Sequence, residues 1–138
     1  MDQTANAAHI EPPDAPAKKI LLVEDDDYLA DVYKTRLVAE GFDVQRVDDG
    51  GKAVAASIQY KPDLVLLDIM MPKISGFDAL TTLRKTPEAA HVKIIMVTAL
   101  GQDNDREKAE QLGADDYLVK SQVVVADVVE KVKQHLGI

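Results

Sequence analysis

The sequence predicts an α/β fold in which one doubly wound parallel sheet is covered by helices on both faces. Short apolar segments alternate with segments of helical periodicity, and this alternation repeats five times. The apolar residues are mostly Val, Leu, Ile and Ala, as in buried parallel strands, with only 4% aromatics. At 138 residues the chain has room for one core, so we expect five strands and five helices joined by right-handed crossovers.

Residues 1–17 differ in composition from the rest of the chain. They contain three prolines and hardly any side chain suited to a core, which predicts a disordered N-terminal tail. The folded domain is expected to cover residues 18–138. Because only two residues follow the last predicted helix, we expect a stand-alone domain.

The first two strand and helix units occupy the N-terminal half of the folded region. An apolar strand at 19–23 precedes a helix at 27–40, which Gly41 closes. The strand at 43–47 alternates polar and apolar residues, and a helix at 51–60 follows it. This second strand is the most polar of the five, so we expect it at an edge of the sheet.

The third strand, at 64–67, is wholly apolar and is expected in the middle of the sheet. Pro72 and Gly76 bracket a loop before the third helix. The fourth unit has a strand at 93–98 and a charged, weakly amphipathic helix at 102–112.

The fifth unit combines a short strand at 116–119 with a valine-rich helix at 122–136. Val123 and Val124 lie partly outside the core stripe of this helix. They belong either to a partner surface or to a wide core face, and the pattern does not separate the two.

Composition excludes several classes of function. The formal net charge of -8 argues against direct nucleic-acid binding, which needs clustered Lys and Arg. The chain has no cysteine for disulfides or thiolate metal sites, and its apolar runs are too short to span a bilayer. The N-terminus lacks the layout of a signal peptide, so we expect a cytoplasmic protein with no membrane contact.

Chemistry-bearing residues follow four of the predicted strands. Glu24 and Asp25 follow the first strand, Asp68 the third, Thr98 closes the fourth and Lys120 follows the fifth. The carboxyl ends of parallel strands share one edge of the sheet, so these side chains are expected to converge there. Carboxylates at that edge suit Mg²⁺, which binds through one or two carboxylates together with phosphate oxygens and water.

This set of residues fits phosphoryl transfer. Asp68 is the candidate nucleophile, because a carboxylate can form an acyl phosphate. Lys120 would neutralise a phosphoryl oxygen, Thr98 would donate a hydrogen bond to another, and Ala99 would leave room for the group to enter. No strong general base is apparent, so we expect a signalling phosphoacceptor that assists only its own phosphorylation and dephosphorylation, and not an enzyme.

The ordered motifs resemble the receiver domains of bacterial two-component response regulators, and the resemblance covers nearly everything after the tail. They are Ile-Leu-Leu-Val-Glu-Asp at 20–25, Leu-Val-Leu-Leu-Asp-Ile-Met-Met-Pro at 64–72, Gly76, Met-Val-Thr-Ala at 96–99 and Asp-Tyr-Leu-Val-Lys at 116–120. The resemblance implies a flavodoxin-like sheet with strand order 2-1-3-4-5, of the kind found in stand-alone chemotaxis regulators.

The same resemblance implies the metal ligands. Asp25 and Asp68 would bind Mg²⁺ directly, Glu24 would bind it through water, and the backbone carbonyl of Met70 would complete the shell. Asp68 would be the phosphoacceptor.

The resemblance also implies a switch and its partners. Thr98 and Tyr117 would form the switch pair, with the hydroxyl drawn toward the phosphoryl group and the aromatic ring following. The donor would be a histidine kinase or a histidine phosphotransfer protein. The output would be a protein target, or a phosphorylation-dependent dimer, on the surface formed by 102–112, 116–119 and 122–136.

One residue departs from the family pattern. Ser121 follows the active-site Lys120, where the family usually has proline and often a cis peptide bond. A cis bond before a residue other than proline costs several kcal/mol more, which favours a trans bond and a slightly different aim for Lys120, with a strained cis bond as the alternative.

The sequence fits three other functions less well. A haloacid-dehalogenase-type phosphatase would carry a second Asp two residues after its nucleophile, but Met70 stands there. A pseudo-receiver, which binds partners without phosphoryl chemistry, would be expected to lack Asp68, Lys120 or the acidic pair, and all are present. Flavin binding would need a Ser/Thr/Gly-rich phosphate loop after the first strand and aromatic residues around the ring, and both are missing.

Overall fold

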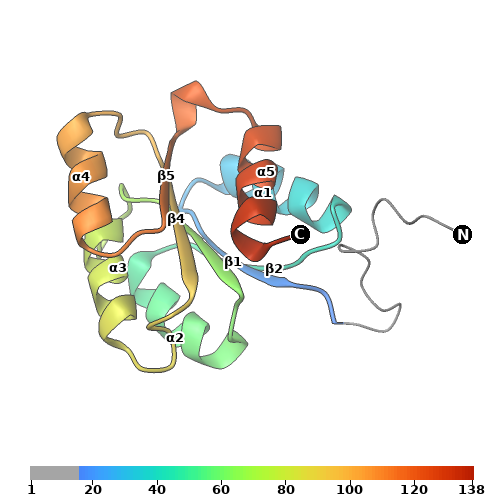
Figure 1. Cartoon of the computed structure of the whole chain (residues 1–138), viewed down its shortest axis with the longest axis horizontal. Coiled ribbons are helices and arrows are strands. Elements are labelled where there is room, and N and C mark those ends of the chain that lie inside the picture. Colours follow the sequence, from blue (N-terminus) through green and yellow to red (C-terminus); the bar gives the residue numbers. More distant parts are fainter. Residues whose placement is uncertain (1–15) are drawn as a thin grey trace, which may run out of the picture.

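The computed structural model describes residues 16–138, so the predicted disordered tail lies outside the described residues except for its last two positions. Five parallel strands form one sheet in the order β2-β1-β3-β4-β5, as predicted (Figure 1). The strands are β1 (Lys19–Val23), β2 (Asp43–Val47), β3 (Leu64–Leu67), β4 (Lys93–Thr98) and β5 (Asp116–Val119).

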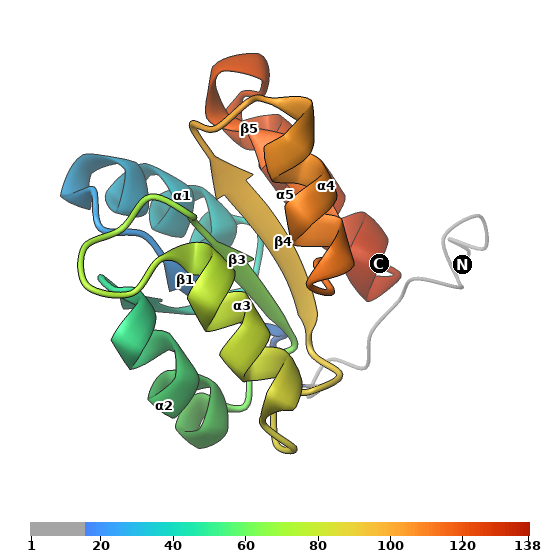
Figure 2. The ribbon, with the colours of Figure 1, turned by 90° about the vertical axis from the view of Figure 1, so that its left-hand side faces the viewer.

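Five helices cover both faces of this sheet (Figure 2). Core residues of α1 and α5 pack on one face, and those of α2, α3 and α4 pack on the other. The helices are α1 (Asp27–Ala39), α2 (Gly50–Tyr60), α3 (Gly76–Lys85), α4 (Asp103–Gln111) and α5 (Val125–Leu136). Within residues 16–138, none of the helices has the length and apolar character needed to cross a membrane.

Burial follows the polarity of the strands. All four residues of β3 are buried, because this central strand has a neighbour on each side and helices on both faces. The first three residues of β2 are exposed, buried and exposed in turn, and the strand lies at one edge of the sheet. Both placements confirm the expectations from the sequence.

Polar side chains set the starts of three helices at the carboxyl edge of the sheet. The side chains of Asp26, Asp49 and Ser75 each accept a backbone N–H in the first turn, of α1, α2 and α3 respectively. Each of these caps lies in a loop that follows the carboxyl end of a strand. α4 is different: only Ala109 is buried, so this helix is loosely anchored to the fold.

The last helix begins later than predicted. The sequence pattern predicts a start at residue 122, but α5 begins at Val125, after a 3₁₀ turn at Lys120–Gln122. The Asp127 carboxylate accepts the backbone N–H of Val124 and so stabilises the start of the helix at that point. Val123 packs partly against the core, whereas Val124 is exposed.

Candidate functional site

The strand register brings the predicted site residues to one edge of the sheet. Val23 pairs with Leu67, so Glu24 and Asp68, the next residue on each strand, emerge side by side. Thr98 pairs with Val119, which places Lys120 one step beyond the end of β4. The carboxyl ends of β1, β3, β4 and β5 therefore build the site together.

Lys120 bridges two buried carboxylates at this edge. Its Nζ donates to Oδ2 of Asp68 at 2.9 Å and lies 2.8 Å from Oε1 of Glu24. Glu24 is only 2% exposed and Asp68 only 4%, while the lysine side chain retains 17% exposure. The site thus holds a partly solvent-accessible cation against two carboxylates that are nearly out of contact with water.

Burial and charge shift the pKa values of this cluster. Burial raises the pKa of Glu24, and the hydrogen bond from Lys120 offsets this rise only in part. Burial alone would lower the pKa of Lys120, but the hydrogen bonds to Glu24 and Asp68 outweigh it and raise that pKa. Lys120 therefore stays charged across the physiological pH range.

The acidic residues at this edge are suited to a hard cation. Glu24, Asp25 and Asp68 each offer a carboxylate oxygen, and these oxygens lie within 4.8 Å of one another. Asp25 is exposed and the other two are buried, so the cluster opens to solvent on the Asp25 side. A donor set made only of oxygen, with an open side for water and phosphate, matches what Mg²⁺ requires.

The loop after β3 continues from the site. The backbone N–H of Met70 donates to Oδ1 of Asp68 at 3.3 Å, which turns the chain back over the carboxylate. The Met70 side chain itself is exposed. Met70 therefore lies where its backbone, and not its side chain, borders Asp68.

The two predicted switch residues are linked through Leu100. Thr98 is fully buried, and its hydroxyl oxygen accepts the backbone N–H of Leu100 at 3.3 Å. The Tyr117 hydroxyl donates to the carbonyl of the same residue at 2.7 Å. Tyr117 is only 2% exposed, so its ring already occupies the inward position, and Ala99 between Thr98 and Leu100 is exposed.

Arg106 of α4 is a contact that the sequence did not reveal. Its guanidinium carbon lies 4.9 Å from the centre of the Tyr117 ring, and its Nη1 donates to the Tyr117 carbonyl at 3.1 Å. In the sequence it is one charge among many on a polar helix. Nothing in the sequence pattern marked it as the residue that faces the tyrosine.

Arg46 at the end of β2 was missed for the same reason. Its Nε donates to the Glu24 carbonyl at 2.8 Å, and its Nη1 pairs with Asp27 at 2.9 Å. It thereby braces the backbone that carries the acidic pair. A single arginine in a polar edge strand gives no signal for such a role.

The peptide bond between Lys120 and Ser121 is trans, as the energetic cost of a cis bond before serine predicts. Lys120 nevertheless reaches both carboxylates. The departure from the family pattern at Ser121 therefore does not remove the lysine from the site.

Comparison with known proteins identifies the family. The family model of the response regulator receiver domain matches residues 20–133. DivK, a polar-differentiation response regulator of Brucella anthropi, is 30% identical over 120 residues, which are 87% of this chain and 97% of DivK. RpaA, a DNA-binding dual master transcriptional regulator of Synechocystis sp., is 41% identical over 102 residues, which are 74% of this chain and 42% of RpaA.

The chain spans less than half the length of the transcriptional regulators among these relatives, between 39% and 45% in each case. Its fold is similar to a CheY-like receiver domain from Methanospirillum hungatei, with a TM-score of 0.82 and 31% identity, covering 88% of this chain and 95% of that one.

A second similar structure is the receiver domain of a Pseudomonas aeruginosa sensor histidine kinase, solved with a magnesium ion coordinated in its active-site cleft. Its TM-score is 0.81 at 31% identity, covering 89% of this chain and 100% of that one. The family match, the identity to a relative of nearly equal length and the shared fold agree, and the chain belongs to the response regulator receiver domains of two-component systems.

Proposed function

We propose that this receiver domain is a phosphoacceptor switch that takes a phosphoryl group onto Asp68. The observation that carries the proposal is the position of Lys120, whose Nζ contacts both Asp68 and Glu24 at the carboxyl edge of the sheet. A nucleophilic carboxylate beside a fixed cation is the arrangement that phosphoryl transfer onto aspartate needs.

The step itself is a displacement at phosphorus. An Asp68 carboxylate oxygen attacks the phosphorus of a phosphohistidine, a P–O bond forms as the P–N bond breaks, and the imidazole leaves with the electron pair. Lys120 neutralises one phosphoryl oxygen and the Thr98 hydroxyl donates to another, while the exposed Ala99 leaves space for entry. The chain itself would assist only this transfer and its later hydrolysis.

Mg²⁺ fits the residues present at this edge. Asp25 and Asp68 would hold it directly, Glu24 through water, and the Met70 backbone carbonyl would complete the protein ligands. When bound, the ion supplies positive charge that reduces repulsion between the carboxylate and the phosphoryl oxygens. A magnesium ion coordinated in the cleft of the similar Pseudomonas aeruginosa domain supports this assignment.

The switch would act through Leu100. If Thr98 moves toward a phosphoryl group, the backbone of Leu100 moves with it, and the Leu100 carbonyl holds the Tyr117 hydroxyl. The ring is already inward in this structure, so phosphorylation would raise the population of this packing and need not create it.

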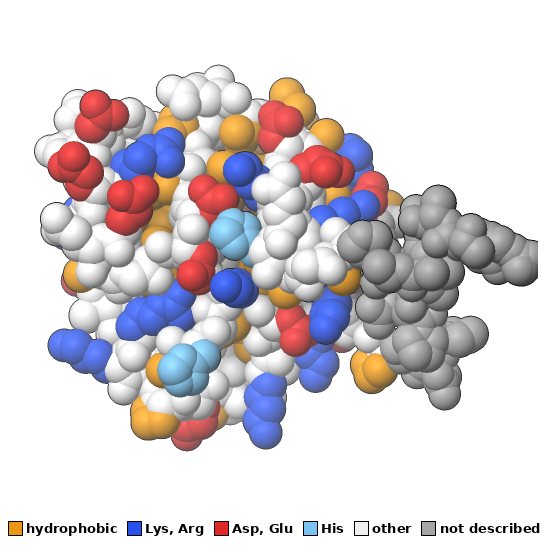
Figure 3. Space-filling model, in the orientation of Figure 1, with side chains coloured by type: hydrophobic (Ala, Val, Ile, Leu, Met, Phe, Trp, Pro, Cys, Tyr) orange, Lys and Arg blue, Asp and Glu red, His pale blue; other side chains and the backbone are white. Residues whose placement is uncertain are grey.

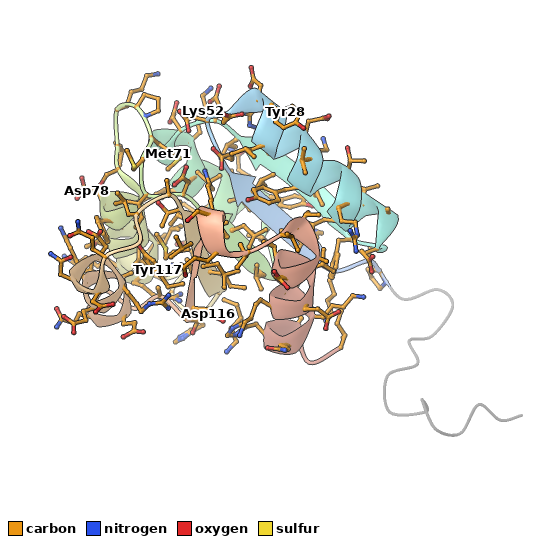
Figure 4. The ribbon with its side chains drawn as sticks, turned by 90° about the horizontal axis from the view of Figure 1, so that it is seen from above. Tyr28, Lys52, Met71, Asp78, Asp116 and Tyr117 are labelled. Carbon is orange, nitrogen blue, oxygen red and sulfur yellow. The ribbon has the colours of Figure 1, made fainter. Side chains whose placement is uncertain are left out.

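The partner that donates the phosphoryl group would be a histidine kinase or a histidine phosphotransfer protein in the cytoplasm. Exposed apolar side chains follow three of the site strands: Tyr28 after β1, Met70 after β3 and Val124 after β5. Figure 4 looks down on this edge of the sheet and shows Tyr28 there. Together they offer an apolar rim on which a donor protein can dock.

The output surface would be the face formed by α4, β5 and α5. Acidic and basic side chains are interspersed over this face (Figure 3), and the loosely anchored α4 can adjust when Tyr117 shifts. A protein target or a second phosphorylated copy of the domain would bind there.

The test is intact mass after incubation with acetyl phosphate, with and without Mg²⁺. Wild-type protein is expected to gain one phosphoryl group only when Mg²⁺ is present, and Asp68→Asn is expected to gain none. Asp78→Asn, which changes an exposed carboxylate on α3, is the matched control and should be modified like the wild type. No adduct on folded wild-type protein, with a phosphohistidine donor and short reaction times also tried, would favour the pseudo-receiver instead.

A further inference from the structure

The loop between β3 and α3, which carries Met70, packs against the first residue of α2. Within the loop, Ile74 donates its backbone N–H to the Pro72 carbonyl at 2.9 Å, and Lys73 adopts a left-handed backbone conformation with φ of 69°. The loop closes where Gly76 donates to the Ile69 carbonyl at 2.8 Å. The loop is thus compact, and its Ile74 end contacts the start of α2.

Gly50, the first residue of α2, forms the close contact with that far end. A Cβ atom placed on Gly50 would lie 2.5 Å from the Ile74 carbonyl oxygen, which is too close for a carbon and an oxygen that are not bonded. The obstacle is backbone, so it cannot turn aside as a side chain would. The loop can lie where it does only because residue 50 has no side chain.

Asp49 fixes Gly50 in this position. It is 5% exposed, its Oδ1 accepts the Lys52 backbone N–H at 2.9 Å as the cap of α2, and its Oδ2 lies 3.6 Å from Nζ of Lys73. One buried carboxylate therefore joins the start of α2 to the loop. Among the described residues, the carboxylates that could hold a metal ion are those of Glu24, Asp25 and Asp68, so Asp49 lies outside that cluster.

We infer that Gly50 and Asp49 are positioning residues for the proposed Mg²⁺ site. Their contacts with Ile74 and Lys73 fix the position of the loop between β3 and α3 and, through it, the position of the Met70 carbonyl. This rests on the proposed function, in which that carbonyl is a metal ligand. Mg²⁺ demands near-ideal octahedral geometry, so a small displacement of one ligand lowers its affinity.

Gly50→Ala is expected to raise the Kd for Mg²⁺ about tenfold, measured by isothermal titration and by displacement of Mn²⁺ followed by electron paramagnetic resonance. Lys52→Ala is the matched control. It shortens a side chain in the first turn of the same helix that is 57% exposed and pairs with Asp48, while the backbone N–H that Asp49 accepts remains, so its Kd should stay within about twofold of wild type.

A second readout separates positioning from loss of structure. The rate of adduct formation by Gly50→Ala should return to the wild-type maximum when the Mg²⁺ concentration is raised, because only the metal affinity is impaired. A purely structural role would lower the melting temperature and leave the Kd for Mg²⁺ unchanged in the folded protein, and that result would overturn the inference.

Failure of the variant to fold and failure of the wild type to bind Mg²⁺ lead to different conclusions. If Gly50→Ala does not fold, Asp49→Ala decides: loss of the cap and of the Lys73 pair should raise the Kd at least about threefold, and an unchanged Kd overturns the inference. If the wild-type protein itself binds no Mg²⁺, the proposed function fails together with this inference. Wild-type binding combined with an unchanged Gly50→Ala affinity refutes the inference alone.

Discussion

The ammonium nitrogen of Lys120 lies 2.9 Å from Oδ2 of Asp68, although 52 positions separate the two residues in the sequence. The same nitrogen contacts Glu24, so one cation balances two buried carboxylates when no metal is present. The lysine and the proposed Mg²⁺ would compete for the same negative charge, so we expect Lys120 to affect both the stability of this cluster and its affinity for the ion.

Lys120→Met is expected to destabilise the domain by about 3 kcal/mol in the absence of metal, because it leaves Glu24 and Asp68 buried without their cation. Urea unfolding of the two proteins in chelator measures this loss. Mg²⁺ should then stabilise the variant more than the wild type, since no ammonium group repels it.

Lys52→Met is the matched control for Lys120→Met. Lys52 pairs with Asp48 at 2.7 Å, but both side chains are more than half exposed, so little change in stability is expected. Equal urea midpoints for Lys120→Met and Lys52→Met would contradict a structural role for the buried pair.

Arg106→Ala is expected to release the Tyr117 ring from its inward position. The variant loses the guanidinium that lies over the ring and the hydrogen bond to the Tyr117 carbonyl, a cost of about 1 to 2 kcal/mol. The aromatic NMR signals of Tyr117 should broaden or shift toward those of an exposed tyrosine.

The control lies on the same helix. Lys108 has its Nζ 4.4 Å from the centre of the Phe77 ring, so Lys108→Ala also removes a cation from an aromatic ring, but not from the Tyr117 ring. Its Tyr117 signals should match those of the wild type. If the Tyr117 signals of Arg106→Ala match those of the wild type and of Lys108→Ala, Arg106 does not hold the ring.

The fold could be predicted because each strand has a composition that fits its place in the sheet. The wholly apolar 64–67 segment belongs in the centre, and the alternating 43–47 segment belongs at an edge, where one side lacks a partner strand. The start of the last helix could not be predicted, because Val123 and Val124 extend the apolar pattern to residues that precede the helix. The helix begins only at Val125, where the Asp127 carboxylate accepts the backbone N–H of Val124.

The candidate site was predictable for a related reason. Side chains at the carboxyl ends of parallel strands must meet, so Asp68 and Lys120 could be brought together from their places after β3 and β5. Two kinds of contact could not be predicted: those made by a long side chain that reaches across the fold, and those possible only because a residue has no side chain. Arg46, Arg106 and Gly50 each make a contact around the candidate site that is visible only in the three-dimensional structure.

Arg84→Met is expected to destabilise the domain by about 3 kcal/mol, well away from the site. The Arg84 guanidinium joins α3 to the segments before β4 and β5. It donates to the carbonyls of Gly113 at 2.9 Å and Val92 at 2.6 Å, and to the carboxylate of Asp115 at 2.9 Å. Removing it leaves partly buried carbonyl groups without a donor.

Thermal and urea unfolding of Arg84→Met measure this loss, with Arg36→Met as the control. Arg36 pairs with Glu40 one turn away on the surface of α1, so that variant should unfold close to the wild type. Phosphorylation of Asp68 should survive in the Arg84 variant at temperatures where it is folded. A variant as stable as the wild type would show that these hydrogen bonds contribute nothing net.

The stability of the face formed by α4, β5 and α5 should depend on pH through Asp116, which Figure 4 labels beside Tyr117. Burial alone would raise the pKa of Asp116, but hydrogen bonds from His135 and from the Tyr117 backbone, with the charge of Lys131, outweigh it and lower the pKa below 3.8. His135 Nε2 lies 2.9 Å from Oδ2 of Asp116, which ties α5 to β5.

A lowered pKa in the folded state means that the unfolded chain takes up the proton first as the pH falls. The stabilisation from ionised Asp116 is therefore present above pH 3.8 and is lost as the pH falls through the folded-state value. Urea midpoints between about pH 2.5 and about pH 6 should fall more steeply for the wild type than for Asp116→Asn. Asp31→Asn, at an exposed position on α1, should follow the wild-type slope, and a constant difference between wild type and Asp116→Asn at every pH would show that the ionised carboxylate adds no stability.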